Sequence, residues 1–235
     1  MKTLNPQINV VCVKYGTKYT DEDVTRLYRM VERNLSLPFS FYCLSDTNIP
    51  GIQTIPLDMS LDLETYWWKM CLFNLNWNSP TIYFDLDIII QNNFDYIIQD
   101  YNDKIHCIDV RDTGAHMLND GTDDTPLTIP LTTMNSSVML FTPIHHADMY
   151  ERFIANVDYN IIAYFGVDRF ISNLFEERLE RLQFRKDYYF RNQHPEGWDV
   201  DYIDKTGLYK DPRVTFCIIT QAIPEDYKNM EEYFL

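Results

Sequence analysis

The chain has 235 residues, of which 46% are apolar, and its formal net charge is -15. This length and composition, with only 7 glycines and 11 prolines, exclude a disordered chain and favour one compact domain over residues 1–235. The negative charge excludes broad binding to nucleic acid or to an anionic membrane, because like charges repel each other.

The first third of the chain alternates strand and helix patterns. Residues 8–13 form an apolar run that predicts a strand, and residues 14–19 form a turn with cationic and aromatic side chains. Thr20 suits the N-cap of a helix reaching Leu35, because acidic residues follow it and apolar residues recur at helical spacing. Two more strands, at 39–44 and 52–55, and a helix at 63–75 follow.

Residues 81–90 read as one buried strand that carries two carboxylates, Asp85 and Asp87. Residues two apart on a strand point to the same side, so both carboxylates would face one site. Paired like charges in a partly buried place call for a cation, and oxygen ligands favour a hard ion such as Mg²⁺ or Mn²⁺. The alternative is a strand that ends at Phe84, with the two aspartates in a turn. If they bind metal, replacing either by alanine should abolish metal-dependent nucleotide binding and leave the fold intact or slightly more stable.

The second half of the chain is less regular. Its patterns predict strands at 105–110 and 137–141, helices at 147–156 and 169–181, and a late strand at 213–219. Residues 111–134 are rich in Asp, Thr, Gly and Pro, which predicts a loop over the active site. Together with the first third, this alternation predicts an α/β fold with a mostly parallel central sheet flanked by helices.

Ligands of open α/β sheets bind beyond the carboxyl ends of the strands. The turn at 14–19, Asp46 and the pair Asp85 and Asp87 all follow predicted strands. They would combine an aromatic ring for a base, a carboxylate for a ribose or base, and a cation for phosphates. The sequence therefore predicts a nucleotide-diphosphate site at this edge of the sheet.

Several segments resemble, in their order and spacing, the motifs of glycosyltransferases with the GT-A fold. They are residues 11–19, residues 34–46, Trp67-Trp68 with Lys69, residues 83–87, and residues 134–139. The sequence is similar to the small glycosyltransferase-like proteins of bacteria and phages, and more distantly to the glycogenin-like group. The resemblance covers nearly the whole chain. It implies a single GT-A domain that transfers a sugar from a nucleotide-sugar donor, such as a UDP-sugar or GDP-sugar, to a carbohydrate or other hydroxyl acceptor.

The resemblance also implies roles for individual residues. Asp85 and Asp87 would hold Mn²⁺ or Mg²⁺ against the donor diphosphate, and Asp168 and Asn135 would be catalytic. Asn135 and Ser136 either bind sugar hydroxyls or form a turn before a strand. Tyr15 or Tyr19 would stack on the base. The full set of implied donor-binding residues is Val13, Lys14, Tyr15, Tyr19, Asp46, Lys69, Asp85 and Ser136.

Two segments depart from the family pattern. Relatives carry C-F-H-G-x-P-K-P after the last strand, whereas here Ile219 stands for the histidine, Thr220 for the glycine and Ile223 for the lysine. On this register a metal ligand and a phosphate contact are missing. The family's G-D-Q-D appears as residues 166–169, where Asp168 is either a catalytic carboxylate or an acidic residue favoured by the start of a helix.

Alternatives to an active transferase stay open at this point. A non-catalytic GT-A domain that binds a nucleotide, a sugar or a protein partner would explain the missing histidine and lysine, and a metal-dependent nucleotidyltransferase is a weaker option. His194 is a substitute metal ligand or a surface loop residue. Adjacent residues do not share a helix face, which favours a surface role for His145 and His146 over a metal pair. The apolar neighbours of Trp67 and Trp68 favour core packing for at least one of them.

The five cysteines lie far apart, show no C-x-x-C pair, and read as reduced core residues. The beginning of the chain lacks the pattern of a signal peptide, and no segment has the length of a membrane span. These features predict a cytoplasmic protein, in the host cytoplasm if it is viral.

Overall fold

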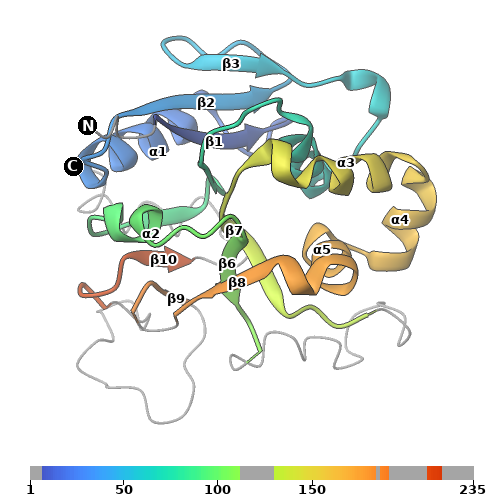
Figure 1. Cartoon of the computed structure of the whole chain (residues 1–235). Helices are drawn as coiled ribbons and strands as arrows, with labels where there is room; N and C mark the ends of the chain where they lie inside the picture. The colour runs from blue at the N-terminus through green and yellow to red at the C-terminus, as the bar shows by residue number, and fades with distance from the viewer. Residues whose placement is uncertain (1–6, 112–129, 184–185, 191–210, 219–235) are drawn as a thin grey trace.

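The structure, a computed structural model, describes residues 7–111, 130–183, 186–190 and 211–218. Its main element is a seven-stranded sheet (Figure 1). The strands of this sheet are β1 (Ile8–Lys14), β2 (Phe39–Ser45), β3 (Gln53–Pro56), β4 (Thr81–Phe84), β6 (Ile105–Asp109), β7 (Met134–Phe141) and β8 (Leu179–Leu182). Their spatial order is β3-β2-β1-β4-β7-β6-β8.

A smaller three-stranded sheet and five α-helices complete the described part of the fold. The small sheet has the order β5-β10-β9 and consists of β5 (Ile88–Ile90), β9 (Tyr188–Phe190) and β10 (Phe216–Ile218). The helices are α1 (Asp21–Asn34), α2 (Asp95–Gln99), α3 (Ala147–Ile154), α4 (Val157–Tyr164) and α5 (Val167–Phe175). Segments of 3₁₀ helix cover Met59–Leu61, Thr65–Asn74, Pro143–His146 and Glu176–Arg178.

The large sheet is mostly parallel, which confirms the α/β fold predicted from the sequence. Parallel pairs join β1 to β2 and β4, β2 to β3, and β6 to β8, whereas β7 runs antiparallel to both β4 and β6. Because of this reversal, β7 begins beside the end of β4. The backbone N–H of Asp85 accordingly donates a hydrogen bond to the carbonyl of Ser137 at 2.9 Å.

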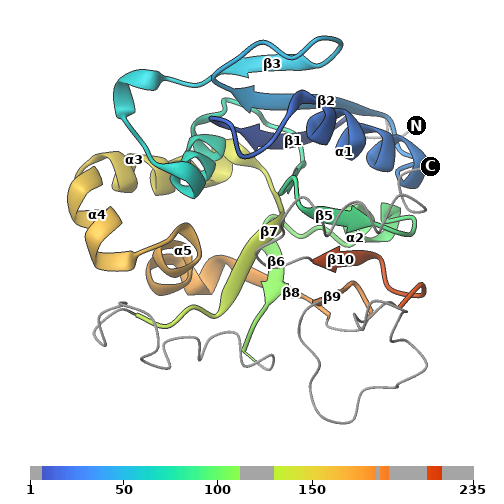
Figure 2. The same cartoon turned by 180° about the vertical axis from the view of Figure 1, so that it is seen from behind.

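Apolar cores lie on both faces of the large sheet. Helices α1 and α2 lie with the small sheet on one side, and α3, α4 and α5 lie on the other (Figures 1 and 2). Successive residues of a strand pack alternately into the two cores. Val10 and Ile82 belong to the apolar cluster that includes residues of α1, and Val11 and Tyr83 belong to the one that includes residues of α5. The sheet is therefore buried on both faces, as its near-continuous apolar strands require.

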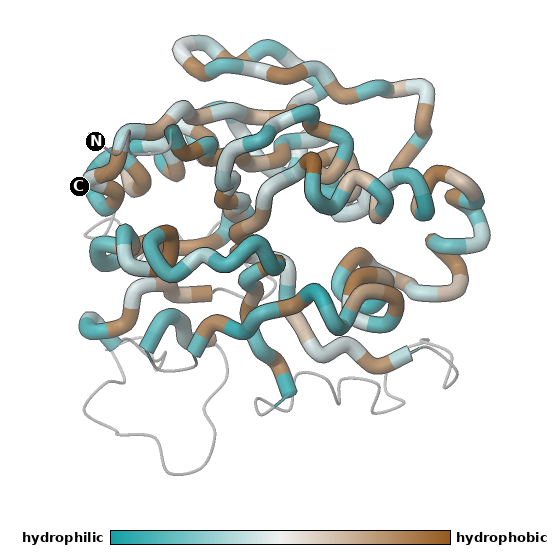
Figure 3. The backbone as a smooth tube through the Cα atoms, viewed as in Figure 1, coloured by the Kyte–Doolittle hydropathy of each residue, from teal (hydrophilic) through white to brown (hydrophobic). Residues whose placement is uncertain are grey.

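Helix α1 begins where local signals predict. The side-chain oxygen of Thr20 accepts a hydrogen bond from the backbone N–H of Asp23, and the Asp23 carboxylate accepts one from the N–H of Thr20 at 2.7 Å. This capping box satisfies two amide groups at the start of the helix. Hydrophilic and hydrophobic residues are interspersed along the helix (Figure 3). Its apolar residues, Val24 and Leu27 among them, recur at helical spacing and are buried. The cap also fixes where the loop after β1 must end.

The predicted strand at 81–90 is wrong as a single element. It divides into β4, which ends at Phe84 in the large sheet, and β5, which begins at Ile88 in the small one. Asp85 and Asp87 therefore lie in the turn between two sheets. The premise that they share one face of a strand is incorrect, because the chain changes sheet at this point.

Other element boundaries also differ from the predictions. The helix predicted at 63–75 is a 3₁₀ segment, and the one predicted at 169–181 ends at Phe175 and gives way to β8. Residues Asn135 and Ser136, expected before a strand, lie inside β7. The sequence patterns missed α2, α4, β8 and β9.

Several predicted features fall in segments that the structure does not describe. Most of the predicted loop at 111–134 lies outside the described residues, as do Ile219, Ile223 and His194. The single domain over residues 1–235 stays a prediction. All five cysteines are free, and all except Cys71 are buried. Every helix in the described ranges is too short or too polar to span a bilayer.

Candidate functional site

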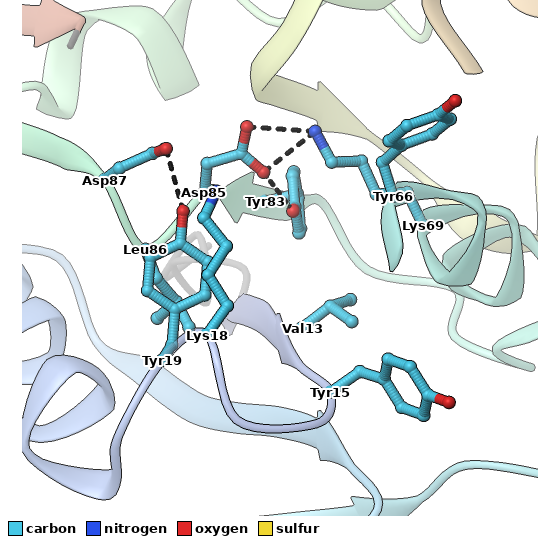
Figure 4. Close-up of a pocket in the computed structure, with 10 residues that line it drawn as sticks. All are labelled: Val13, Tyr15, Lys18, Tyr19, Tyr66, Lys69, Tyr83, Asp85, Leu86 and Asp87. Carbon is cyan, nitrogen blue, oxygen red and sulfur yellow. Dashed lines mark hydrogen bonds and ion pairs between the residues drawn. The ribbon is translucent and has the colours of Figure 1, made fainter. Parts of the chain in front are cut away.

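A cavity of about 180 Å³ lies at the carboxyl ends of β1 and β4 (Figure 4). Three segments line it: the end of β1 with its following loop, the 3₁₀ segment Thr65–Asn74, and the end of β4 with the turn that carries the two aspartates. The lining residues are Val13, Tyr15, Lys18, Tyr19, Tyr66, Lys69, Tyr83, Asp85, Leu86 and Asp87.

The loop after β1 is held in place by a carboxylate from the neighbouring strand. Gly16 has a φ of +65°, a left-handed conformation that glycine adopts without steric cost. Its backbone N–H donates to Asp46 Oδ2 at 3.0 Å, just after β2. Asp46 thus shapes the loop and does not line the cavity. Tyr15 lines it, and its ring packs on Trp68 with 5.3 Å between centroids.

Lys69 forms the centre of the charged side of the cavity. Its Nζ lies 2.8 Å from Asp85 Oδ1, and it also donates to Ser136 Oγ at 3.0 Å. The Tyr83 hydroxyl donates to the same Asp85 carboxylate (Figure 4). Burial alone lowers the pKa of Lys69, but the charges of Asp85 and Asp168 outweigh it and raise that pKa above its usual value. Lys69 is therefore a firmly charged ammonium group.

Asp87 has different surroundings. It accepts a hydrogen bond from the Tyr19 hydroxyl at 2.8 Å. Burial and the nearby charge of Asp85 raise the pKa of Asp87 to about 6, although the Tyr19 hydrogen bond and the charges of Lys18 and Lys69 act in the opposite direction. A further cation beside Asp87 would stabilise the charged form of its carboxylate.

Asp168 joins this cluster from α5. It lies in the first turn of the helix, after Gly166, as predicted, and its Oδ1 accepts a hydrogen bond from the backbone N–H of Ser136 at 3.1 Å. Burial raises the pKa of Asp168, and the positive charge of Lys69 works against that rise. The reversed strand β7 is what brings Ser136 between α5 and Lys69.

The structure brings together most of the residues that the sequence singled out. Val13, Tyr15, Tyr19, Lys69, Asp85 and Asp87 line the cavity. Ser136 and Asp168 connect to it through Lys69.

Lys14 and Asn135 have other contacts. Lys14 donates to Thr47 Oγ1 at 3.2 Å and pairs with Asp21 at 3.4 Å, so it does not line the cavity. The side-chain oxygen of Asn135 accepts from the N–H of Ser137 at 2.9 Å. Binding and catalytic roles for both residues remain predictions.

Four lining residues were missed in the sequence. Tyr83 precedes Asp85 by two positions, and Tyr66 precedes Lys69 by three, so strand and helical periodicity could have found both. Lys18 lies in the cationic turn at 14–19, but the residue pattern of that turn does not distinguish it from Lys14. Leu86 carried no signal beyond its place between the two aspartates.

The described residues fit a divalent cation in part. Asp85 and Asp87 offer hard oxygen ligands, and burial together with the nearby charge of Asp85 raises the pKa of Asp87, which a bound cation would oppose. Within the described ranges, no group of three or more His, Cys, Asp or Glu side chains is placed to hold a metal. A metal here would need further ligands from water, from a bound nucleotide or from residues outside those ranges.

No protein-family model matches the sequence, and no curated protein matches it. Solved structures do. An active-site mutant of LgtC is similar at 13% identity with a TM-score of 0.57, over 95% of each chain. The chain has the GT-A glycosyltransferase fold. This fold recurs in the galactosyltransferase LgtC with donor and acceptor sugar analogues, at 12% identity and a TM-score of 0.55, over 94% of this chain and 99% of that one.

A third similar structure is larger than this chain. The glycosyltransferase GlyE of Streptococcus pneumoniae TIGR4 is similar at 12% identity with a TM-score of 0.54. The match covers 76% of this chain and 46% of GlyE. At such identities the likeness shows the fold alone. The chemistry of the chain must therefore be inferred from the residues that line the cavity.

Proposed function

We propose that the chain is a glycosyltransferase that moves a sugar from a nucleoside-diphosphate donor to a hydroxyl group of an acceptor. One observation carries the proposal. Six side chains chosen from the sequence for nucleotide and metal binding, from segments far apart in the chain, line one cavity of a GT-A fold. A UDP-sugar or GDP-sugar is the expected donor, and a carbohydrate is the expected acceptor.

The donor diphosphate would bind beside Asp85 and Asp87, which would hold Mn²⁺ or Mg²⁺. The bound metal would supply positive charge to the leaving diphosphate, whose negative charge grows as the glycosidic bond breaks. Asp85 is already paired with Lys69 at 2.8 Å, and Tyr19 holds Asp87. These contacts orient both carboxylates before any ligand arrives, which lowers the cost of binding.

Lys69, Ser136 and Asp168 would act on the sugar side of the reaction. Asp168 is a carboxylate with a raised pKa next to a buried ammonium group. A raised pKa makes a carboxylate a better proton acceptor, which suits it to take the proton of the acceptor hydroxyl. The same negative charge would also stabilise an anomeric carbon that becomes cationic. Tyr15, fixed against Trp68, would offer its ring to the base.

A thermal-shift panel of nucleoside diphosphates and nucleotide sugars, each with and without Mn²⁺, tests this proposal. Because the described residues offer the metal only the carboxylates of Asp85 and Asp87, Mn²⁺ alone should raise the melting temperature little. Mn²⁺ and the matching nucleotide together should raise it by more than the sum of the separate effects, since each ligand improves the binding of the other by the same factor. In Asp87→Asn the joint effect should disappear. A wild-type protein that no member of the panel stabilises would refute the proposal.

A further inference from the structure

Among the described residues that line the cavity, two carry ammonium groups, and they differ in what they contact. Lys69 is largely buried and paired with Asp85. Lys18 is exposed, and its Nζ lies 4.7 Å from the centroid of the Tyr19 ring. Among the described residues, no carboxylate lies within ion-pair distance of Lys18. Lys18 can therefore form an ion pair with an anionic ligand.

The position of Lys18 is set by the same loop that orients Asp87. Figure 4 shows the Lys18 side chain beside Tyr19, reaching toward the turn that carries the two aspartates. The Tyr19 hydroxyl donates to Asp87 at 2.8 Å, so adjacent residues of one loop contact a carboxylate and present an ammonium group. The loop ends at Thr20, the N-cap of α1, two residues after Lys18.

An anionic ligand needs such a cation here. The chain has a net charge of -15, and Asp85 and Asp87 line the same cavity. A diphosphate that approaches these carboxylates meets unfavourable charge unless local cations balance it. Lys69 already neutralises Asp85, so it leaves less charge for a ligand. Lys14, the other lysine of this region, is 5% exposed and directed to Asp21 and Thr47.

We propose that Lys18 binds the diphosphate of the donor and thereby makes the cavity prefer nucleoside diphosphates over monophosphates. The inference rests on the proposed function, since it assigns one contact of that donor. The ammonium group would contact phosphate oxygens from the side of the β1 loop. Part of the diphosphate affinity would then persist when the metal is removed.

Titration calorimetry on three variants of the full chain tests this contact. Lys18→Met removes the charge but keeps an unbranched side chain, and Lys18→Arg keeps the charge. Lys104→Met is the matched control, because it causes the same change in net charge at an exposed residue just before β6, at the end of the sheet away from the cavity. The probes are a nucleoside monophosphate, the corresponding diphosphate and inorganic pyrophosphate, each with Mn²⁺ and again with a chelator.

Lys18→Met should bind the diphosphate and pyrophosphate about tenfold more weakly, the usual effect of losing one charge-assisted hydrogen bond near a surface. Its affinity for the monophosphate should change less. Lys18→Arg should recover most of the affinity, and Lys104→Met should bind like the wild type. Equal diphosphate affinity in Lys18→Met and Lys104→Met would overturn the inference.

The outcomes also separate this inference from the proposed function. If the wild type turns over a nucleotide sugar and Lys18→Met keeps full diphosphate affinity, the inference alone fails. If Lys18→Met loses affinity for diphosphate and pyrophosphate but no nucleotide sugar is ever consumed, the anion contact stands and the proposed transfer fails. A wild type that binds none of the probes would overturn both.

Discussion

Asp85 and Asp87 are two residues apart, yet the structure gives them opposite effects on stability. Asp85 is paired with Lys69, and the two side chains are only 19% and 12% exposed. Asp87 keeps its negative charge against burial and against the charge of Asp85. The sequence treats the pair as equivalent, and it predicts an intact or slightly more stable fold for either substitution. The structure separates them.

Replacing Asp87 by asparagine should stabilise the fold at neutral pH. The pKa of Asp87 is raised to about 6 in the folded state. Between the ordinary pKa of an aspartate and pH 6, the folded state therefore binds more protons than the unfolded state, and the free energy of unfolding falls as the pH rises through that window. The Asp87→Asn variant does not lose stability in this way. At about pH 8 its free energy of unfolding should therefore exceed that of the wild type by about 1–3 kcal/mol. Urea unfolding in metal-free buffer measures the difference, which should narrow as the pH falls below 6. A difference that does not change with pH would contradict this assignment.

Replacing Asp85 by asparagine should have the opposite sign. It leaves the buried ammonium group of Lys69 without its carboxylate, and breaking a buried ion pair in this way typically costs about 3 kcal/mol or more. Asp87→Asn, which removes the same charge two residues away, is the control. In the double variant Asp85→Asn with Lys69→Met, most of the loss should be recovered. An Asp85→Asn protein as stable as the wild type in urea would mean that the ion pair is not formed in solution.

At the scale of elements, sequence signals were reliable where they are local. Helix α1 was predictable from Thr20, the acidic residues after it and the apolar spacing. The division of residues 81–90 was not, because it depends on which sheet each half joins. The 3₁₀ form of Thr65–Asn74 was also hidden, since its pattern equally fits an α-helix. Pairing decides such cases, and pairing involves residues far apart in the sequence.

The cap of α1 offers a test at this scale. Thr20→Ala removes the side-chain acceptor for the Asp23 N–H and half of the capping box, which should cost about 1 kcal/mol in the free energy of unfolding. Thr25→Ala is a suitable control, because Thr25 is partly exposed on the same helix, its hydroxyl bonds only back to the Asp21 carbonyl, and alanine is favoured there. Chemical denaturation of both variants compares them directly. Equal stability of the two would argue against the cap.

At the scale of the whole molecule, the sequence predicted the edge of the sheet where the cavity lies, but not all the residues that line it. The rule that ligands bind at the carboxyl ends of parallel strands correctly brought the β1 loop and the two aspartates together. Ser136 reaches Lys69 only because β7 runs against its neighbours, which the sequence did not reveal. Successive residues of a strand point to opposite faces, so Val13 lines the cavity while Lys14 contacts Asp21 and Thr47, and a binding role for Lys14 remains a prediction.

We expect this cavity to bind a nucleotide sugar and to break the bond between the sugar and the diphosphate. Release of nucleoside diphosphate from a panel of UDP-sugars and GDP-sugars, with Mn²⁺ and simple sugar acceptors, measures it most directly. Wild-type protein should release the diphosphate from at least one donor, and Asp87→Asn, which should fold at least as stably, should be slower by about a hundredfold because charge stabilisation of the leaving group is lost. Release from no donor above a protein-free control, or equal release by Asp87→Asn, would contradict the account.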